Sequence, residues 1–127
     1  MSGVTPRTRT SLPRWESGLD DCLAGVAWTS TGDRLAALTV GGQLVVFTTW
    51  GERVWQSEAH PGGALSLSLS PCGGWLATGG CDGRVSVWEV RTGVQRAQFR
   101  SGNGWVERLA WCPRGDLLAV AVGRRLT

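Results

Sequence analysis

The sequence predicts an all-β fold, and three observations lead to this prediction. The 127-residue chain has 19 glycines, many of them between short apolar stretches, as expected where tight turns join short strands. Some of these stretches alternate apolar and polar residues with period two, which is the periodicity of a β-strand. The whole pattern then recurs along the chain, and self-similarity at a fixed spacing indicates a repeat architecture.

The repeat is visible in three segments that align without gaps. They are "WTSTGDRLA" (28–36), "LSPCGGWLA" (69–77) and "WCPRGDLLA" (111–119), offset by 41 and then 42 residues. The block that follows recurs as well, since "VGGQLVVF" (40–47) aligns with "CDGRVSVW" (81–88). A period in this range is typical of a propeller with one sheet per repeat.

The residue pattern within each repeat predicts four short strands separated by turns. Residues 64–70, "ALSLSLS", place leucines on one face and serines on the other, and this strict alternation indicates a strand. Residues 44–47 and 117–122 are continuously apolar, as expected of strands covered on both faces by neighbouring sheets. Gly41-Gly42 and Asp82-Gly83 are the clearest hairpin turns. The fold class predicted is therefore a β-propeller with blades of four-stranded antiparallel sheets.

The second repeat, residues 59–93, resembles a repeat of the WD40 family. Ala59-His60 stands where the family has Gly-His, and Trp88-Glu89 stands where it has Trp-Asp. The family joins four side chains in a hydrogen-bonded structural tetrad, and the matching residues here are His60, Thr78, Asp82 and Trp88. The resemblance implies that Trp88 donates to the Thr78 hydroxyl, that Thr78 bonds His60, and that Asp82 accepts from His60, so that buried polar atoms satisfy one another.

The other repeats depart from this pattern. The first has Ala37 in place of the hydroxyl residue, Gly41 in place of the aspartate and Phe47 in place of the tryptophan, so we expect no tetrad there. The third repeat follows the family pattern at its start and stops at "GRRLT" (123–127). This is the position where we expect the third strand of that repeat to begin. We divide the chain into a flexible tail and WD40-like blades, with these approximate bounds: tail 1–14, blades 15–127, and repeats 19–59, 60–101 and 102–127.

This division predicts an incomplete ring of about 2.5 to 3 blades, whereas known propellers have four to eight. Three explanations stay open. The chain is the N-terminal portion of a longer propeller, it assembles as a homo-oligomer that completes a ring, or it is a stand-alone incomplete stack of sheets. An open stack leaves apolar faces and a sheet edge uncovered, which favours pairing with other chains.

The resemblance implies a non-catalytic scaffold for protein–protein interaction. In such a propeller, the loops that enter each blade and the turns between second and third strands share one face of the disc. The candidate partner-binding residues on that face are Glu58, Arg84, Arg100, Asn103 and Trp105. Trp105 with Arg100 is the best pair, because tryptophan and arginine dominate interaction hot spots. Packing at the start of a strand is the alternative for Trp105.

The remaining tryptophans divide into two groups by their positions in the repeats. We expect Trp28, Trp75 and Trp111 to pack between blades. Trp50 and Trp55 flank a turn, and we expect them on the outer rim.

The charge of the chain is concentrated near its N-terminus. The formal net charge is +3, and residues 1–14 carry Arg7, Arg9 and Arg14 without an acid. The rest of the chain is formally neutral, which argues against a nucleic-acid-binding face on the fold. Binding of nucleic acid or an acidic partner through the arginine-containing segment 5–14 stays as an alternative.

No pattern in the chain points to a metal, a cofactor or catalysis. Its four cysteines form no C-x-x-C pair and it has one histidine, which argues against zinc. H-E-x-x-H and G-x-S-x-G are absent, and Asp20-Asp21 is interpreted as a turn. We expect free thiols packed as small hydrophobes in a reducing cytoplasm. No stretch reaches the roughly 20 apolar residues that span a bilayer.

Overall fold

The computed structural model describes residues 18, 19, 21–123 and 125–127. The tail expected at residues 1–14 lies outside these ranges. The described residues form the strands β1 (Leu23–Trp28), β2 (Arg34–Thr39), β3 (Gln43–Thr48), β4 (Arg53–Glu58), β5 (Ala64–Leu69), β6 (Trp75–Gly80), β7 (Arg84–Glu89), β8 (Gln95–Arg100), β9 (Val106–Trp111), β10 (Leu118–Val122) and β11 (Arg125–Leu126).

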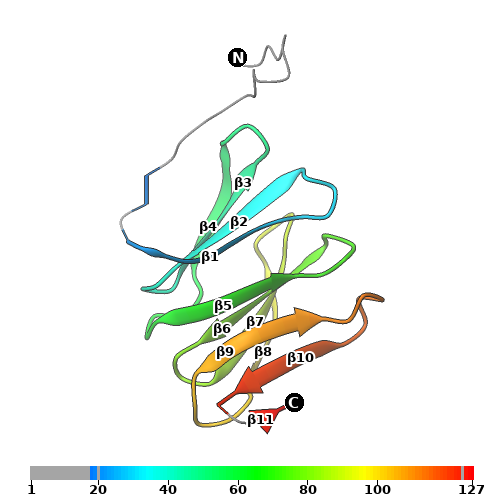
Figure 1. Ribbon diagram of the computed structural model, residues 1–127. Coiled ribbons are helices and arrows are strands. Elements are labelled where there is room, and N and C mark those ends of the chain that lie inside the picture. Colours follow the sequence, from blue (N-terminus) through cyan, green and yellow to red (C-terminus); the bar gives the residue numbers. More distant parts are fainter. Residues whose placement is uncertain (1–17, 20, 124) are drawn as a thin grey trace, which may run out of the picture.

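These strands form three antiparallel sheets, each in simple chain order. Blade 1 is β1-β2-β3-β4, blade 2 is β5-β6-β7-β8, and blade 3 contains β9, β10 and the short β11. The sheets are stacked one on the next (Figure 1). The predicted fold, four-stranded antiparallel blades in an incomplete propeller, is confirmed.

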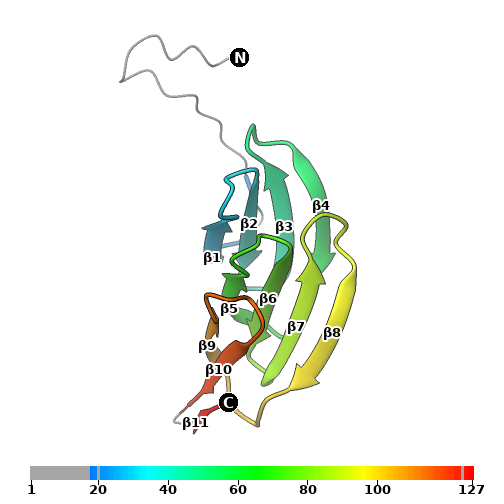
Figure 2. The same cartoon turned by 90° about the vertical axis from the view of Figure 1, so that its right-hand side faces the viewer.

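The first strand of each blade lies innermost in the stack. Strands β1, β5 and β9 run side by side along one edge, while β4 and β8 lie at the opposite edge (Figure 2). Two glycines allow the innermost strands to approach the neighbouring sheet. A Cβ on Gly25 would lie 3.1 Å from the Leu67 side chain, and a Cβ on Gly79 would collide with Val106. The Ser66 hydroxyl also donates to the Val106 carbonyl at 2.8 Å, which ties blade 2 to blade 3.

Each blade has a leading face, turned toward the preceding blade, and a trailing face, turned toward the next. The core between blades 1 and 2 is built by the buried residues Ala36, Leu38, Leu44, Val46, Ala59, Ala64, Leu76, Trp88 and Val90. A second core, between blades 2 and 3, contains Val85, Val106, Val120 and Val122. The leading face of β2 and β3 in blade 1 carries Ala37, Val45 and Phe47, with Leu19 packed against them.

The structure corrects part of the expectation for the tryptophans. Trp111 does pack between blades, since its indole Nε1 donates to the Ser68 carbonyl at 2.9 Å. Trp28 and Trp75 were expected there too, but they are 50% and 36% exposed. Trp28 lies on the leading face of blade 1, which no other blade of the described chain covers, and Trp75 lies beside the turn that precedes β6.

The two tryptophans expected on the rim also differ from each other. Trp50, in the turn after β3, is 59% exposed as expected. Trp55 lies between blades 1 and 2 instead, where its Nε1 donates to the Val90 carbonyl at 2.6 Å and its ring packs against the core. The reason is that strand β4 places alternate side chains on opposite faces of the sheet, and position 55 falls on the face toward blade 2.

The cysteines are unpaired in the structure, as predicted. Their packing differs from the expectation, because Cys22 and Cys72 are exposed while Cys81 and Cys112 are only partly buried. All four lie next to a strand end or in a turn, where the sheets offer less cover than at the middle of a strand.

Candidate partner-binding surface

Three of the four residues expected in the tetrad are buried and joined by hydrogen bonds. The His60 Nε2 atom lies 2.9 Å from the Thr78 Oγ1 atom, and the Trp88 indole Nε1 donates to the same oxygen at 3.0 Å. All three residues are at most 3% exposed. A hydroxyl has one donor and two acceptor sites, so the Thr78 hydroxyl can bond both His60 and Trp88.

Asp82 departs from the expectation that it accepts a hydrogen bond from His60. Its Oδ1 accepts from the backbone N–H of Arg84 at 3.0 Å, and its Oδ2 pairs with the Arg84 Nε at 3.4 Å. None of the hydrogen bonds of the described residues joins Asp82 to His60. The carboxylate instead stabilises its own turn, which is a usual role of aspartate at this position of a turn. Gly80 lies between the two side chains, since a Cβ there would be within 3 Å of both.

Asp82 still acts on His60 through its charge. Burial lowers the pKa of His60, and the nearby Asp82 carboxylate opposes this shift without cancelling it. His60 is therefore held neutral inside the blade at neutral pH.

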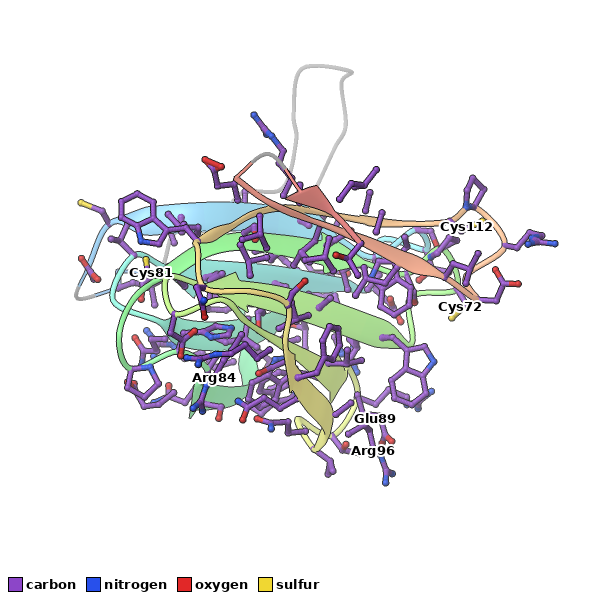
Figure 3. All side chains as sticks on the ribbon, turned by 90° about the horizontal axis from the view of Figure 1, so that it is seen from below. Cys72, Cys81, Arg84, Glu89, Arg96 and Cys112 are labelled. Carbon is purple, nitrogen blue, oxygen red and sulfur yellow. The ribbon has the colours of Figure 1, made fainter. Side chains whose placement is uncertain are left out.

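The connections that enter the blades and the turns between second and third strands gather at one end of the sheets, here called the upper face. The Ala59 N–H donates to the Gly42 carbonyl and the Ser101 N–H donates to the Gly83 carbonyl, both at 2.8 Å. In Figure 3, Cys81 and Arg84 lie at this end, and Cys72 and Cys112 lie at the opposite end.

Arg84 and Arg100 form a hollow at the outer part of the upper face. They are direct cross-strand partners on β7 and β8, and with Gln98 and Phe99 they line a hollow of about 360 Å³. Like charges directly opposite each other disfavour pairing of the strands, so an anion between them would relieve this cost. Phe99 is 43% exposed. We call this site the arginine hollow.

Trp105 does not share this hollow, although we expected it to pair with Arg100. It is 59% exposed and lines a second hollow of about 480 Å³, together with Leu65, Glu107, Arg108, Ala121 and Gly123. The connection between β8 and β9 explains the separation, because it runs from the outermost strand of blade 2 to the innermost strand of blade 3. Arg100 stands at its outer end and Trp105 at its inner end.

The two other candidates are exposed at the same face. Glu58 ends β4 opposite Gln43, and Asn103 lies in the connection between β8 and β9. Sequence reasoning missed Phe99 and Gln98. A signal was present, since "QRAQFR" (95–100) carries a phenylalanine in a mostly polar strand at the outer edge of a blade.

Within the described ranges, no cluster of three or more His, Cys, Asp or Glu side chains could hold a metal ion. Asp21 uses its carboxylate to accept from the N–H groups of Cys22 and Gly41, at 2.7 and 2.6 Å. Asp20 lies outside the description. The described part of the chain also contains no helix with the length and apolar character needed to cross a membrane.

The sequence has relatives among curated proteins. The ribosome biogenesis protein ERB1 of Lodderomyces elongisporus is 42% identical over 77 residues, which cover 54% of this chain and 9% of that protein. The ribosome biogenesis protein BOP1 homolog of Oryza sativa subsp. japonica is 41% identical over 71 residues, which cover 54% and 10%. The chain thus spans about a tenth of the length of these relatives.

Two solved structures show the same fold. The structure of U3-55K superimposes with a TM-score of 0.78 at 15% identity, covering 82% of this chain and 34% of that one. The RRP9 WD40 repeats superimpose with a TM-score of 0.77 at 15% identity, covering 82% and 33%. Residues 26–111 match the family described as the anaphase-promoting complex subunit 4 WD40 domain. Since this match covers more than half of the chain and agrees with the blades and the relatives, the chain belongs to the WD40-repeat family of β-propellers.

Proposed function

We propose that this chain is a non-catalytic WD40 scaffold that binds a protein partner through its upper face. The observation that carries the proposal is the arginine hollow, in which Arg84 and Arg100 lie directly opposite each other on the same face of blade 2. Arginine and aromatic side chains supply most of the binding energy at protein interfaces. The family assignment supports the scaffold role at the level of the fold.

The chemistry of the arginine hollow favours an acidic segment of the partner. The Arg84 and Arg100 side chains offer several N–H donors, and a guanidinium can bind a carboxylate with two parallel hydrogen bonds. Inside this chain, Arg84 pairs with Asp82 at 3.4 Å and Arg100 donates to the Asp82 carbonyl at 3.3 Å. These contacts leave donors for a ligand, because a guanidinium has five N–H groups.

The remaining candidates extend this surface along the upper face. Trp105 and Arg108 line the second hollow with the apolar Leu65, and Glu58 and Asn103 are exposed at the same end of the sheets. A partner segment that reaches both hollows would contact the two arginines in the first and Trp105 in the second. We therefore propose the arginine hollow as the anchor and Trp105 as a second contact.

The test is quantitative capture of partners by the immobilised chain from a cell extract. Arg84→Ala with Arg100→Ala should reduce the captured partner at least tenfold, because two charge-assisted contacts are lost. Arg114→Ala is the matched control, since Arg114 is exposed in the turn after β9, at the opposite end of the sheets, and pairs with Asp116. If both variants capture the same proteins in the same amounts, the arginine hollow does not bind the partner.

The identity of the partner is a separate proposal. The relatives carry names that refer to ribosome biogenesis, which makes proteins of ribosome-assembly complexes the first partners to test. The same names bear on location, because the cytoplasm was predicted from the free thiols. A fluorescent fusion of the chain, compared with markers of the cytosol and of the sites of ribosome assembly, distinguishes the two locations.

A further inference from the structure

A cavity lies in the joint between blades 1 and 2, at the end of the sheets opposite the upper face. Its volume is about 250 Å³, and its lining includes Asp33 and Arg34 of blade 1 and Cys72, Gly74 and Arg91 of blade 2. Both blades have four strands. In Figure 3, Cys72 lies at the far end of the sheets from Arg84. We call this site the lower cavity.

Hydrogen bonds fix the segments that form the lower cavity. The Ser30 hydroxyl donates to the Pro71 carbonyl at 2.6 Å and so joins the turn before β2 to the turn before β6. Within blade 2, the Val90 N–H donates to the Gly74 carbonyl at 3.0 Å. The backbone around the cavity is therefore held in place by contacts of the chain itself.

Cys72 supplies the lower cavity with a nucleophile. Its Sγ lies 3.3 Å from the Ser70 hydroxyl and accepts from the Gly74 N–H at 3.4 Å. These contacts, the one with Ser70 first, lower the pKa of the thiol. Cys72 is also exposed, so a small reagent can reach it. A thiolate of this kind attacks disulfide sulfur atoms.

Arg34 brings an unused hydrogen-bond donor to the same cavity. Its Nη1 donates to the Asp33 carbonyl at 2.9 Å, whereas its Nε is buried and finds no hydrogen-bond partner within the described part of the chain. A buried donor without a partner costs free energy. Arg91 adds a second, exposed guanidinium to the lining. Guanidinium groups bind carboxylates with short, charge-assisted hydrogen bonds.

The acid in the lining is already engaged. The Asp33 Oδ1 accepts from the hydroxyls of Thr29 and Thr31, both at 2.7 Å. These contacts, the one with Thr31 first, lower the pKa of Asp33, which is therefore ionised at neutral pH. Two arginines against one aspartate leave the lining with a net positive charge, which attracts an anionic reagent.

The combination of arginine and thiol is not a general feature of a blade joint. At the joint between blades 2 and 3, the repeat counterparts of Arg34 and Cys72 are Trp75 and Arg114. The fold is thus built at that joint with neither group in its place, which favours a role in binding or reaction for Arg34 and Cys72.

We propose that the lower cavity is a modification site, in which Cys72 forms a mixed disulfide with a small disulfide that carries carboxylates, such as glutathione disulfide. Arg34 and Arg91 bind the carboxylates of the reagent. The Cys72 thiol gives its proton to water, and the thiolate attacks one sulfur of the reagent. The new bond joins Cys72 to that sulfur, the S–S bond of the reagent breaks, and the second half leaves as a thiolate that takes up a proton. This proposal is independent of the arginine hollow.

The test compares two disulfides on the purified chain. Glutathione disulfide carries carboxylates and hydroxyethyl disulfide is uncharged. Peptide mass spectrometry over time measures the rate at each cysteine. Glutathione disulfide should modify Cys72 faster than Cys22, the other exposed thiol, and dithiothreitol should remove the modification.

Substitution of the arginines tests recognition of the carboxylates. Arg34→Gln and Arg91→Gln should each slow the reaction of Cys72 with glutathione disulfide by about two- to fivefold, the usual range for a solvent-accessible ion pair. Neither should change the rate with hydroxyethyl disulfide. Arg84→Gln is the matched control, because it removes one positive charge at the opposite end of the sheets, and it should leave both rates unchanged.

Circular dichroism of each variant shows whether the fold is retained. If Arg34→Gln loses the β-sheet signal, Arg91→Gln decides alone, since Arg91 is exposed. A Cys72 that reacts with glutathione disulfide no faster than Cys22 would overturn the proposal. So would arginine variants with unchanged rates, or variants that slow both reagents equally. Capture of a partner through the arginine hollow is unaffected by any of these results.

Discussion

Trp88 of blade 2 stacks on Trp55 of blade 1, with ring centroids 6.1 Å apart and an angle of 27° between the ring planes. The two indoles use their N–H groups differently. Trp88 donates within its own blade, to Thr78 at 3.0 Å, whereas Trp55 donates across to the Val90 carbonyl of blade 2 at 2.6 Å. The tetrad of blade 2 is therefore also part of the joint between blades 1 and 2.

Trp88→Ala should destabilise the chain more than Phe47→Ala. The two residues are repeat counterparts and both are 3% exposed, so each substitution leaves a cavity, and for Trp88 we expect a loss of about 3–5 kcal/mol in the free energy of unfolding. Loss of Trp88 also removes the donor to Thr78, which costs about 1–3 kcal/mol more. Chemical denaturation of both variants measures the difference. Equal losses would contradict the structural role of the tetrad.

The stacked pair should show coupling in a double-mutant cycle. We expect Trp55→Leu and Trp88→Leu to be non-additive by about 0.5–1.5 kcal/mol in the free energy of unfolding, the usual contribution of an aromatic pair beyond its buried area. A cycle of Trp88 with Trp111, which makes its contact at the other blade joint, serves as the control and should be additive. Additivity in both cycles would show that the stacking contributes nothing.

Stability should fall as the pH is lowered below about 6.5, the ordinary pKa of histidine. The pKa of His60 is lowered in the folded chain, first by burial. The unfolded chain therefore binds a proton at a higher pH than the folded chain does, and protonation favours unfolding between the two pKa values. Thermal unfolding from pH 7 to pH 5 measures this slope. His60→Gln should remove it, because His60 is the one histidine of the chain.

Cys72 should be the more reactive of the two exposed thiols. Its Sγ lies 3.3 Å from the Ser70 hydroxyl and accepts from the Gly74 N–H at 3.4 Å. The Ser70 contact first, and then the Gly74 contact, lower the pKa of Cys72, and the thiolate is the nucleophile. Iodoacetamide at pH 7, followed by peptide mass spectrometry, should label Cys72 faster than Cys22. Ser70→Ala should slow Cys72 and leave Cys22 unchanged; equal rates in the unaltered chain would refute this.

Much of the fold was predictable because short sequence patterns define its strands and turns, and these patterns recur along the chain. The glycine turns and the alternation in residues 64–70 define strands, and the offsets of 41 and 42 residues define blades. The contacts of Trp88 with Thr78 and of Thr78 with His60 followed from the WD40 pattern. The Trp88–Thr78 contact depends on strand register within one sheet, which the turn lengths determine, whereas His60 comes from the connection that enters blade 2.

Contacts between blades and within turns were less accessible to sequence reasoning. Trp55 was expected on the rim and lies in a core, and Trp28 was expected in a core and is half exposed. The Asp82 carboxylate accepts a hydrogen bond from the Arg84 N–H in its own turn, and not the expected one from His60. Each outcome depends on distances between groups that no repeat spacing encodes.

The sequence by itself determined the blades and their strand order, because period and register are properties of neighbouring residues, and the buried Trp88–Thr78–His60 contacts followed from its resemblance to the WD40 family. Only the tertiary structure decided which tryptophans are covered and that Arg100 and Trp105 line separate hollows. The physical reason is that burial of a strand face depends on which sheet lies against it, and this is a property of the stack of blades and not of any one repeat.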